Sequence, residues 1–333
     1  MEVLYIQNFY KNKYHNLMAN FQNGINITGS TSFMDLSATT ENTSSVGKLW
    51  FDISSQTFKY SGDGASFSLG GNMIKDRCNF ASAGTLNAGL AMGGVGGWAA
   101  STEEYDGSSW SNGGYMINDR CNGYGDGTQN AAWTQGCSPS TPQSCTEEYN
   151  GSSWSAGGSS SQGHVLGQGA GTQNAGLAFG GQYMDNTEEY NGTSWSAGGS
   201  MIRYGLINFG GTGTQNAALA AGGYISFSNS FCTEEYNGTA WATGGSLICA
   251  RNCGATLGTQ DNALATGGTG EFTTSTDTES YNGTAWATSA NLVCSIQRHA
   301  ATGQSSVSGL VIGGSPFEST TQELTDAVSP KTF

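Results

Sequence analysis

Positive charge, charged residues in general and long hydrophobic runs are all scarce in this chain. Its 11 lysines and arginines face 25 aspartates and glutamates, which gives a formal net charge of −14. An acidic surface repels phosphate backbones, so nucleic acid is excluded as a partner. The sequence has no apolar stretch of about 18 residues, which excludes a membrane-spanning helix. The first residues lack the apolar core of a secretory signal, so we expect assembly in a cytoplasm.

Histidine is also scarce, and the cysteines are not spaced as metal ligands. The three histidines are His15, His164 and His299. Because they are scattered and no Cys-x-x-Cys occurs, we expect neither a metal site nor a cofactor. Five of the 8 cysteines fall in one segment of the repeat described below: Cys78, Cys121, Cys249, Cys253 and Cys294. Equivalent positions of successive repeats lie far apart, so we expect buried thiols there. Cys137 and Cys145 flank an insertion, and whether they form a disulfide is left open.

A repeated segment is the strongest feature that is present. Thr-Glu-Glu-Tyr-Asn-Gly-Thr-x-Trp or a near copy occurs five times, at 102–110, 146–154, 187–195, 233–241 and 278–286. A looser copy lies near Tyr60 and a truncated one near Leu324, so the aligned positions are 41 to 46 residues apart. A period of about 40–50 residues with four short strand signals is typical of a propeller blade. A closed ring of blades then accounts for the whole repeat region as one domain.

The fourth repeat predicts four strands with their turns. Residues 216–221 form a short apolar run that ends at a Gly-Gly pair, as expected of a buried strand with a tight exit. A variable loop, 224–232, precedes the strand Thr-Glu-Glu-Tyr at 233–236. Asn237-Gly238 then predicts a two-residue type I′ hairpin, in which both central residues have positive φ. The partner strand carries Trp241.

An apolar strand ending in Gly-Gly, followed by a Tyr and then a Trp, resembles the kelch repeat. The resemblance extends over roughly Thr57 to Leu324 and implies a propeller but no particular chemistry. Six apolar strands begin near residues 87, 130, 174, 216, 262 and 308. We therefore expect an all-β protein, a six-bladed kelch-like β-propeller, closed by pairing the region 57–71 with 298–324. Whether the strand at 321–324 displaces that at 57–60 in the closing blade is left open.

The charged and aromatic repeat positions allow a structural and a functional interpretation. The five arginines are Arg77, Arg120, Arg203, Arg251 and Arg298, all between the Trp strand and the next apolar run. They form either a cation ring for an anionic ligand or, as we expect, pairs with the repeat glutamates that join neighbouring blades. The Tyr and Trp positions are expected to pack between blades and not to form sugar platforms. The acidic pairs lack the spacing of a calcium loop and are expected on solvated strand faces.

The residues before the repeats differ in character. Residues 1–46 carry a helix-like apolar spacing and a segment rich in Thr, Ser and Asn. Residues 47–62 contain Gly-x-Leu-Trp-Phe-Asp followed by Phe-Lys-Tyr-Ser-Gly. This pattern resembles a stretch found in bacteriophage tail-fibre and other virion proteins, and the repeats look like proteins of aquatic phages. The resemblance implies two domains: an N-terminal virion-attachment segment at 1–46 and the propeller at 47–333.

These features favour a virion structural protein, a tail fibre or spike that recognises a host surface. The variable loops after the Gly-Gly strands should form one rim, with candidate binding residues Trp98, Tyr183, Tyr224, Phe227, Phe231 and Phe272. Residues 1–46 would bind other virion proteins, the rim would bind a host glycan or protein, and homo-oligomerisation is left open. The alternative is a capsid or tail decoration protein without receptor binding. A radical-copper oxidase is disfavoured because the histidines do not converge. A glycan-active enzyme that uses paired carboxylates is less expected but left open, and no catalytic residues are assigned.

Overall fold

The computed structural model describes residues 65–95, 99–136, 144–270, 274–315 and 318–326, and the backbone of five further short strands. Those strands are β1 (Ala19–Asn20), β2 (Asn26–Ile27), β3 (Leu49–Asp52), β4 (Thr57–Tyr60) and β31 (Lys331–Thr332). The chain divides into two compact units, 1–62 with 330–333 and 63–329. The described part contains strands and no helix, and thus no helix that could cross a membrane. The predicted attachment segment, 1–46, falls inside the first unit, and its role stays a prediction.

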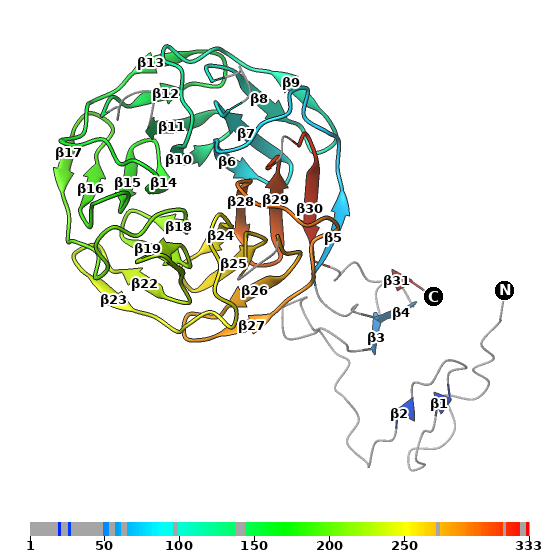
Figure 1. Ribbon diagram of the computed structural model, residues 1–333. Helices are drawn as coiled ribbons and strands as arrows, with labels where there is room; N and C mark the ends of the chain where they lie inside the picture. Colours follow the sequence, from blue (N-terminus) through cyan, green and yellow to red (C-terminus); the bar gives the residue numbers. More distant parts are fainter. Residues whose placement is uncertain are drawn as a thin grey trace. The chain divides into compact units, whose positions relative to one another are not determined.

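The second unit is a six-bladed β-propeller, as predicted (Figure 1). Each blade is a four-stranded antiparallel sheet. Blades 1 to 3 are β6 (Ala81–Thr85), β7 (Ala88–Met92), β8 (Thr102–Tyr105) and β9 (Trp110–Asn112); β10 (Gly123–Thr128), β11 (Ala131–Gly136), β12 (Glu147–Tyr149) and β13 (Trp154–Ala156); and β14 (Gln168–Thr172), β15 (Ala175–Phe179), β16 (Thr187–Tyr190) and β17 (Trp195–Ala197).

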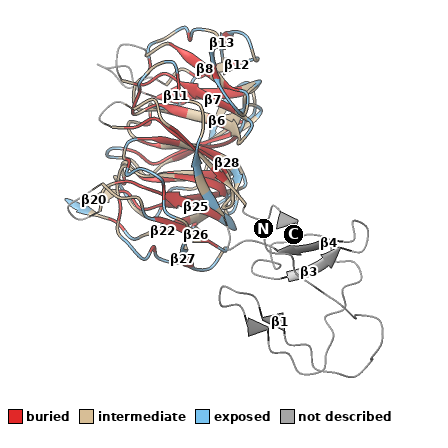
Figure 2. Cartoon of the chain, turned by 90° about the vertical axis from the view of Figure 1, so that its right-hand side faces the viewer, coloured by how far each residue is buried: buried red, intermediate tan, exposed pale blue. Residues whose placement is uncertain are grey.

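Blades 4 to 6 complete the ring. They are β18 (Gly210–Thr214), β19 (Ala217–Ala221), β22 (Thr233–Tyr236) and β23 (Trp241–Thr243); β24 (Ala255–Thr259), β25 (Asn262–Thr266), β26 (Thr278–Tyr281) and β27 (Trp286–Thr288); and β28 (Ala300–Ser305), β29 (Ser308–Ile312), β30 (Thr321–Thr325) and β5 (Ser66–Leu69). The first strand of each blade lies nearest the axis and contacts the first strands of both neighbours (Figure 1). The second strands carry the apolar runs and are buried along most of their length (Figure 2).

Ring closure follows the predicted segments and resolves the open alternative. β5 pairs with β30 in antiparallel register, from Gln322 opposite Leu69 to Thr325 opposite Ser66. An N-terminal strand thus completes the blade that the C-terminal strands begin, which removes two exposed edges. Residues 57–60 are not part of that blade. Within the first unit, β4 pairs with β3 on one side and with β31 on the other.

Glycine is required where each second strand leaves its blade. Gly93 and Gly94 have φ of 73° and 113°, in the left-handed region. A Cβ on Gly93 would lie 2.6 Å from the carbonyl oxygen of Arg120, so both backbone conformation and space exclude a side chain. The same Gly-Gly geometry recurs after β15, β19, β25 and β29.

The predicted type I′ turns between the third and fourth strands are wrong in detail. Tyr236 pairs directly with Trp241, so the connection has four residues. Gly238 has positive φ, but Asn237 does not. The Asn237 side-chain oxygen instead accepts hydrogen bonds from the amides of Thr239 and Ala240, at 3.0 and 2.9 Å. Asparagine therefore acts here as an Asx cap, for which positive φ is not needed.

Candidate functional site

Blades pack through the repeated Tyr and Trp side chains. The Trp241 indole nitrogen donates to Thr187 Oγ1 of the preceding blade at 2.8 Å, and the ring packs in a cluster with Phe179. Equivalent Trp-to-Thr bonds cross four of the other five blade interfaces, from Trp110, Trp154, Trp195 and Trp286. The predicted packing between blades is confirmed for these residues, although Trp195 is only half-buried. These aromatics are therefore part of the scaffold and are not free to act as sugar platforms.

The expectation that the acidic pairs lie on solvated strand faces is wrong. The second glutamate of each pair accepts a hydrogen bond from the Tyr hydroxyl of the next blade, as Glu189 does from Tyr236 at 2.6 Å. Burial, followed by this bond, raises the pKa of Tyr236 to about 12. At the interface of blades 5 and 6 this hydrogen bond is absent, and both its acceptor and its donor are replaced, which supports their coupling. Ser280 stands in place of the glutamate and Leu324 in place of the tyrosine.

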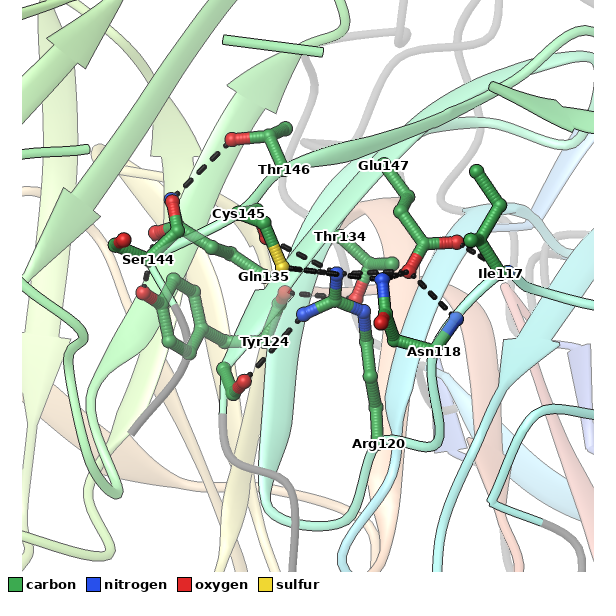
Figure 3. A network of polar contacts seen from close by, with 11 residues as sticks. Ile117, Asn118, Arg120, Tyr124, Thr134, Gln135, Ser144, Cys145, Thr146 and Glu147 are labelled. Carbon is green, nitrogen blue, oxygen red and sulfur yellow. Dashed lines mark hydrogen bonds and ion pairs between the residues drawn. The ribbon is translucent and has the colours of Figure 1, made fainter. Parts of the chain in front are cut away.

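The first glutamate of each pair is buried under the segment that enters its blade. Figure 3 shows this arrangement in blade 2, where Glu147 accepts from the guanidinium of Arg120 and the backbone amide of Ile117, at 2.9 and 2.7 Å. The same guanidinium donates to the carbonyl oxygen of Cys145 at 3.0 Å. Arg120 and Glu147 are both almost completely buried, so the cation is inaccessible to a ligand.

The predicted Arg–Glu pairing is confirmed for four of the five arginines, but each pair joins a blade to its own entering segment and not to a neighbouring blade. The other three pairs are Arg77–Glu103, Arg203–Glu234 and Arg251–Glu279. In blade 3, His164 takes the arginine position and contacts Glu188 at 3.2 Å. In blade 6, Ile296 stands in place of the arginine and Gln322 in place of the first glutamate, so both partners of the ion pair are replaced. The prediction is wrong for Arg298, which lies at a different position of the repeat and forms no ion pair with any carboxylate in the described residues.

The predicted rim residues differ in exposure. Tyr183, Phe227 and Phe231 expose 74%, 96% and 51% of their surface, whereas Tyr224 is half-buried. Trp98 and Phe272 lie outside the described residues, as does Cys137. These loops and the segments that enter each blade hydrogen-bond to each other, as Leu247 N does to Phe231 O at 2.8 Å. We call the end of the propeller that they form the loop face.

Phe227 stands at the tip of a hairpin that occurs in blade 4. The hairpin consists of β20 (Tyr224–Ile225) and β21 (Ser228–Asn229), and it projects from the propeller (Figure 2). Both tip residues have positive φ, 50° at Ser226 and 66° at Phe227, which is rare for side chains without glycine's freedom. The base is fixed, because Asn229 Nδ2 donates to the carbonyl oxygens of Thr269 and Gly270 at 3.1 and 2.8 Å. A strained, fully exposed aromatic on a rigid base is typical of a recognition element.

Sequence reasoning missed two further features of the loop face. The first is a set of exposed aliphatic side chains, one in five of the six entering segments: Ile74, Ile117, Ile202, Ile248 and Val293. Each follows a buried Met or Leu, and its backbone amide donates to the first Glu or to Gln322. In the sequence, the recurring Met-Ile, Leu-Ile and Leu-Val doublets could have indicated these exposed residues. Interaction surfaces often expose apolar groups in this way.

The second feature is a ring of residues around the axis, which we call the axial mouth. Its members precede the innermost strands and are Asn79, Asn122, Leu166, Asn208, Cys253 and Arg298. All six have φ between 52° and 59°. Four backbone N–H···O=C bonds of 2.7 to 3.0 Å join neighbouring members, from Asn122 to Asn79, Asn79 to Arg298, Arg298 to Cys253 and Cys253 to Asn208. Three of these positions are asparagine and the other three carry Leu, Cys and Arg, which hid the equivalence in the sequence.

Arg298 gives the axial mouth its one charge. Its guanidinium hydrogen-bonds the Cys253 thiol and lies near that of Cys78. Burial raises the pKa of the Cys253 thiol, and the bond and charge of Arg298 oppose that rise. Among the described residues no group of histidine, cysteine and carboxylate side chains is arranged to hold a metal ion.

The fold and the loop face define a class of protein, a six-bladed β-propeller. The buried contacts recur from blade to blade, whereas the loops of the loop face differ between blades, as the β20–β21 hairpin of blade 4 shows. No protein-family model and no functionally curated protein matches the sequence.

Proposed function

We propose that this chain is a virion structural protein, a tail fibre or spike, whose propeller presents its loop face to a host surface. The observation that carries the proposal is the β20–β21 hairpin, with Phe227 exposed at a rigidly supported tip. The blade pattern supports a kelch-like repeat. The Gly-x-Leu-Trp-Phe-Asp segment before it supports kinship with phage tail-fibre proteins.

The repeat carboxylates form contacts within the scaffold, whereas the loops vary between blades, and this difference favours recognition over catalysis. Nine glutamates of the repeats are hydrogen-bonded to arginine, histidine, tyrosine or backbone groups of the scaffold, including Glu103 and Glu104 in blade 1. Such groups are poorly placed to protonate or attack a substrate. Loops on a rigid scaffold tolerate differences in length and sequence, which suits a surface that selects its target.

In this proposal residues 1–46 bind other virion proteins, and the particle assembles in the host cytoplasm. Deleting residues 1–46 should leave a folded propeller that no longer enters particles. Exchanging 224–232 for a short Gly-Ser loop should leave assembly intact and reduce adsorption to host cells. The matched control is Thr239→Ala, an exposed change in a turn at the opposite end of blade 4.

The outcomes separate the two roles. Normal adsorption after the exchange would exclude this hairpin from recognition and leave the alternative, a capsid or tail decoration protein. Incorporation of the truncated chain into particles would exclude residues 1–46 as the attachment segment.

A further inference from the structure

Arg298 differs from the four arginines that pair with repeat glutamates. Its side chain is exposed, and no carboxylate of the described residues lies within ion-pair distance of it. Its backbone is nevertheless fixed on both sides. Arg298 N donates to Cys253 O at 2.7 Å, and Arg298 O accepts from Asn79 N at 3.0 Å. The scaffold therefore holds an accessible cation at a defined place on the axis.

Neutral amide groups accompany this cation. Asn79 and Asn208 are half-buried, and their side chains form no hydrogen bond with any described residue. Asn79 is the direct neighbour of Arg298 in the ring, and Asn208 is separated from it by Cys253. No member of the axial mouth is acidic. A guanidinium with nearby amide donors and no competing carboxylate is a suitable site for an oxyanion.

The backbone of the axial mouth is also strained. Asparagine tolerates the left-handed conformation, but Leu166, Cys253 and Arg298 adopt it at φ of 59°, 53° and 54° without that advantage. Strain of this kind persists where the surrounding structure imposes it, and it is common at ligand sites.

We propose that the axial mouth binds the carboxylate of an acidic sugar, with Arg298 as the ion-pair partner and Asn79 and Asn208 as amide donors. A carboxylate matches one guanidinium bidentately and carries a single charge. The formal charge of −14 on the chain penalises a phosphate dianion more strongly than a monoanion. The choice of a sugar as the carrier rests on the proposed function, since host surfaces present acidic glycans.

The test is an NMR titration of the full chain at constant ionic strength, with glucuronate as the probe. Glucuronate and acetate should shift the backbone amide signals of Asn79, Cys253 and Arg298, whereas glucose should not. Arg298→Gln should weaken glucuronate binding about 10-fold or more, as expected for loss of a charged hydrogen bond. Asn79→Gly removes an amide side chain while tolerating the positive φ, and it should weaken binding less. Arg203→Gln is the control, because that guanidinium is already paired with Glu234.

Three results would overturn the proposal: no shift with glucuronate, equal shifts with glucose, or tighter binding of sulfate or phosphate than of glucuronate. Unchanged glucuronate affinity in Arg298→Gln, with an unchanged melting temperature, would also overturn it. Failure of the axial-mouth proposal is distinguishable from failure of the proposed function. Adsorption that depends on the β20–β21 hairpin without glucuronate binding refutes only the axial site. Glucuronate binding with hairpin-independent adsorption supports the axial site and refutes the role of the hairpin.

Discussion

Replacing Phe227 by glycine should make the protein more stable. The backbone at Phe227 has φ of 66°, and left-handed conformation costs a non-glycine residue about 1–2 kcal/mol. Glycine removes that cost but loses about 0.5–1 kcal/mol because the unfolded chain becomes more flexible. The Phe227 ring is 96% exposed, so its removal forfeits almost no buried area. The net expectation is a stabilisation of about 0.5–1 kcal/mol.

Phe227→Ala is the matched control, since it deletes the same ring but keeps a Cβ in the strained conformation. Thermal unfolding should rank Phe227→Gly above both the control and the parent protein. For a chain of this size the difference is about 1–2 °C, at the low end of what 1 kcal/mol produces. Both variants should show the same reduction in adsorption to host cells, because both lose the Phe227 ring. If Phe227→Gly melts at or below the temperature of Phe227→Ala, the strain argument is refuted.

Three further changes test the scaffold. Trp241→Ala should cost about 3–5 kcal/mol of unfolding free energy, because a buried indole and its bond to the preceding blade are lost. Arg120→Ile should cost about 3–5 kcal/mol by leaving Glu147 buried and uncompensated. Adding Glu147→Gln, which copies blade 6, should recover most of that loss. Asp126→Asn should raise the melting temperature at pH 8 but not at pH 3.5, since burial raises the pKa of Asp126 to about 7.

The sign for Asp126 follows from proton linkage. The folded state holds the Asp126 proton up to about pH 7, whereas the unfolded state releases it near the ordinary aspartate pKa of 3.8. Stability is therefore complete below about pH 3.8 and falls as the pH rises toward 7. Asp126 is only partly buried by surface area and accepts hydrogen bonds from the amides of Gly127 and Gly171, which limits the size of the effect. A pH-independent effect of Asp126→Asn would contradict this account.

For the other two changes, guanidinium unfolding is the measurement. A Trp241→Ala variant with unchanged stability and only a binding defect would return the indole to a ligand role. If Glu147→Gln recovers nothing in the Arg120→Ile background, the paired replacement in blade 6 has another cause.

The repeat was sufficient to predict the ring, because its determinants are local. Gly-Gly exits, alternating apolar positions and a 41-to-46-residue period each depend on residues close in sequence, and six copies average out local irregularities. The pairing of arginines with glutamates was predictable for the same reason, since complementary charges recur at corresponding places. The turn at Asn237 was not, because the dipeptide Asn-Gly is compatible with more than one hairpin geometry.

The candidate sites depended on tertiary structure. Phe227 was identified as an aromatic in a variable loop, but its exposure and strain arise from a hairpin anchored to the neighbouring blade through Asn229. Asn79 and Arg298 are 219 residues apart in the sequence and become neighbours when the ring closes. The sequence by itself determined the blades, whose strands pair with chain neighbours. The contact between Asn79 of blade 1 and Arg298 of blade 6 depended on closure of the ring, because it joins distant parts of the chain.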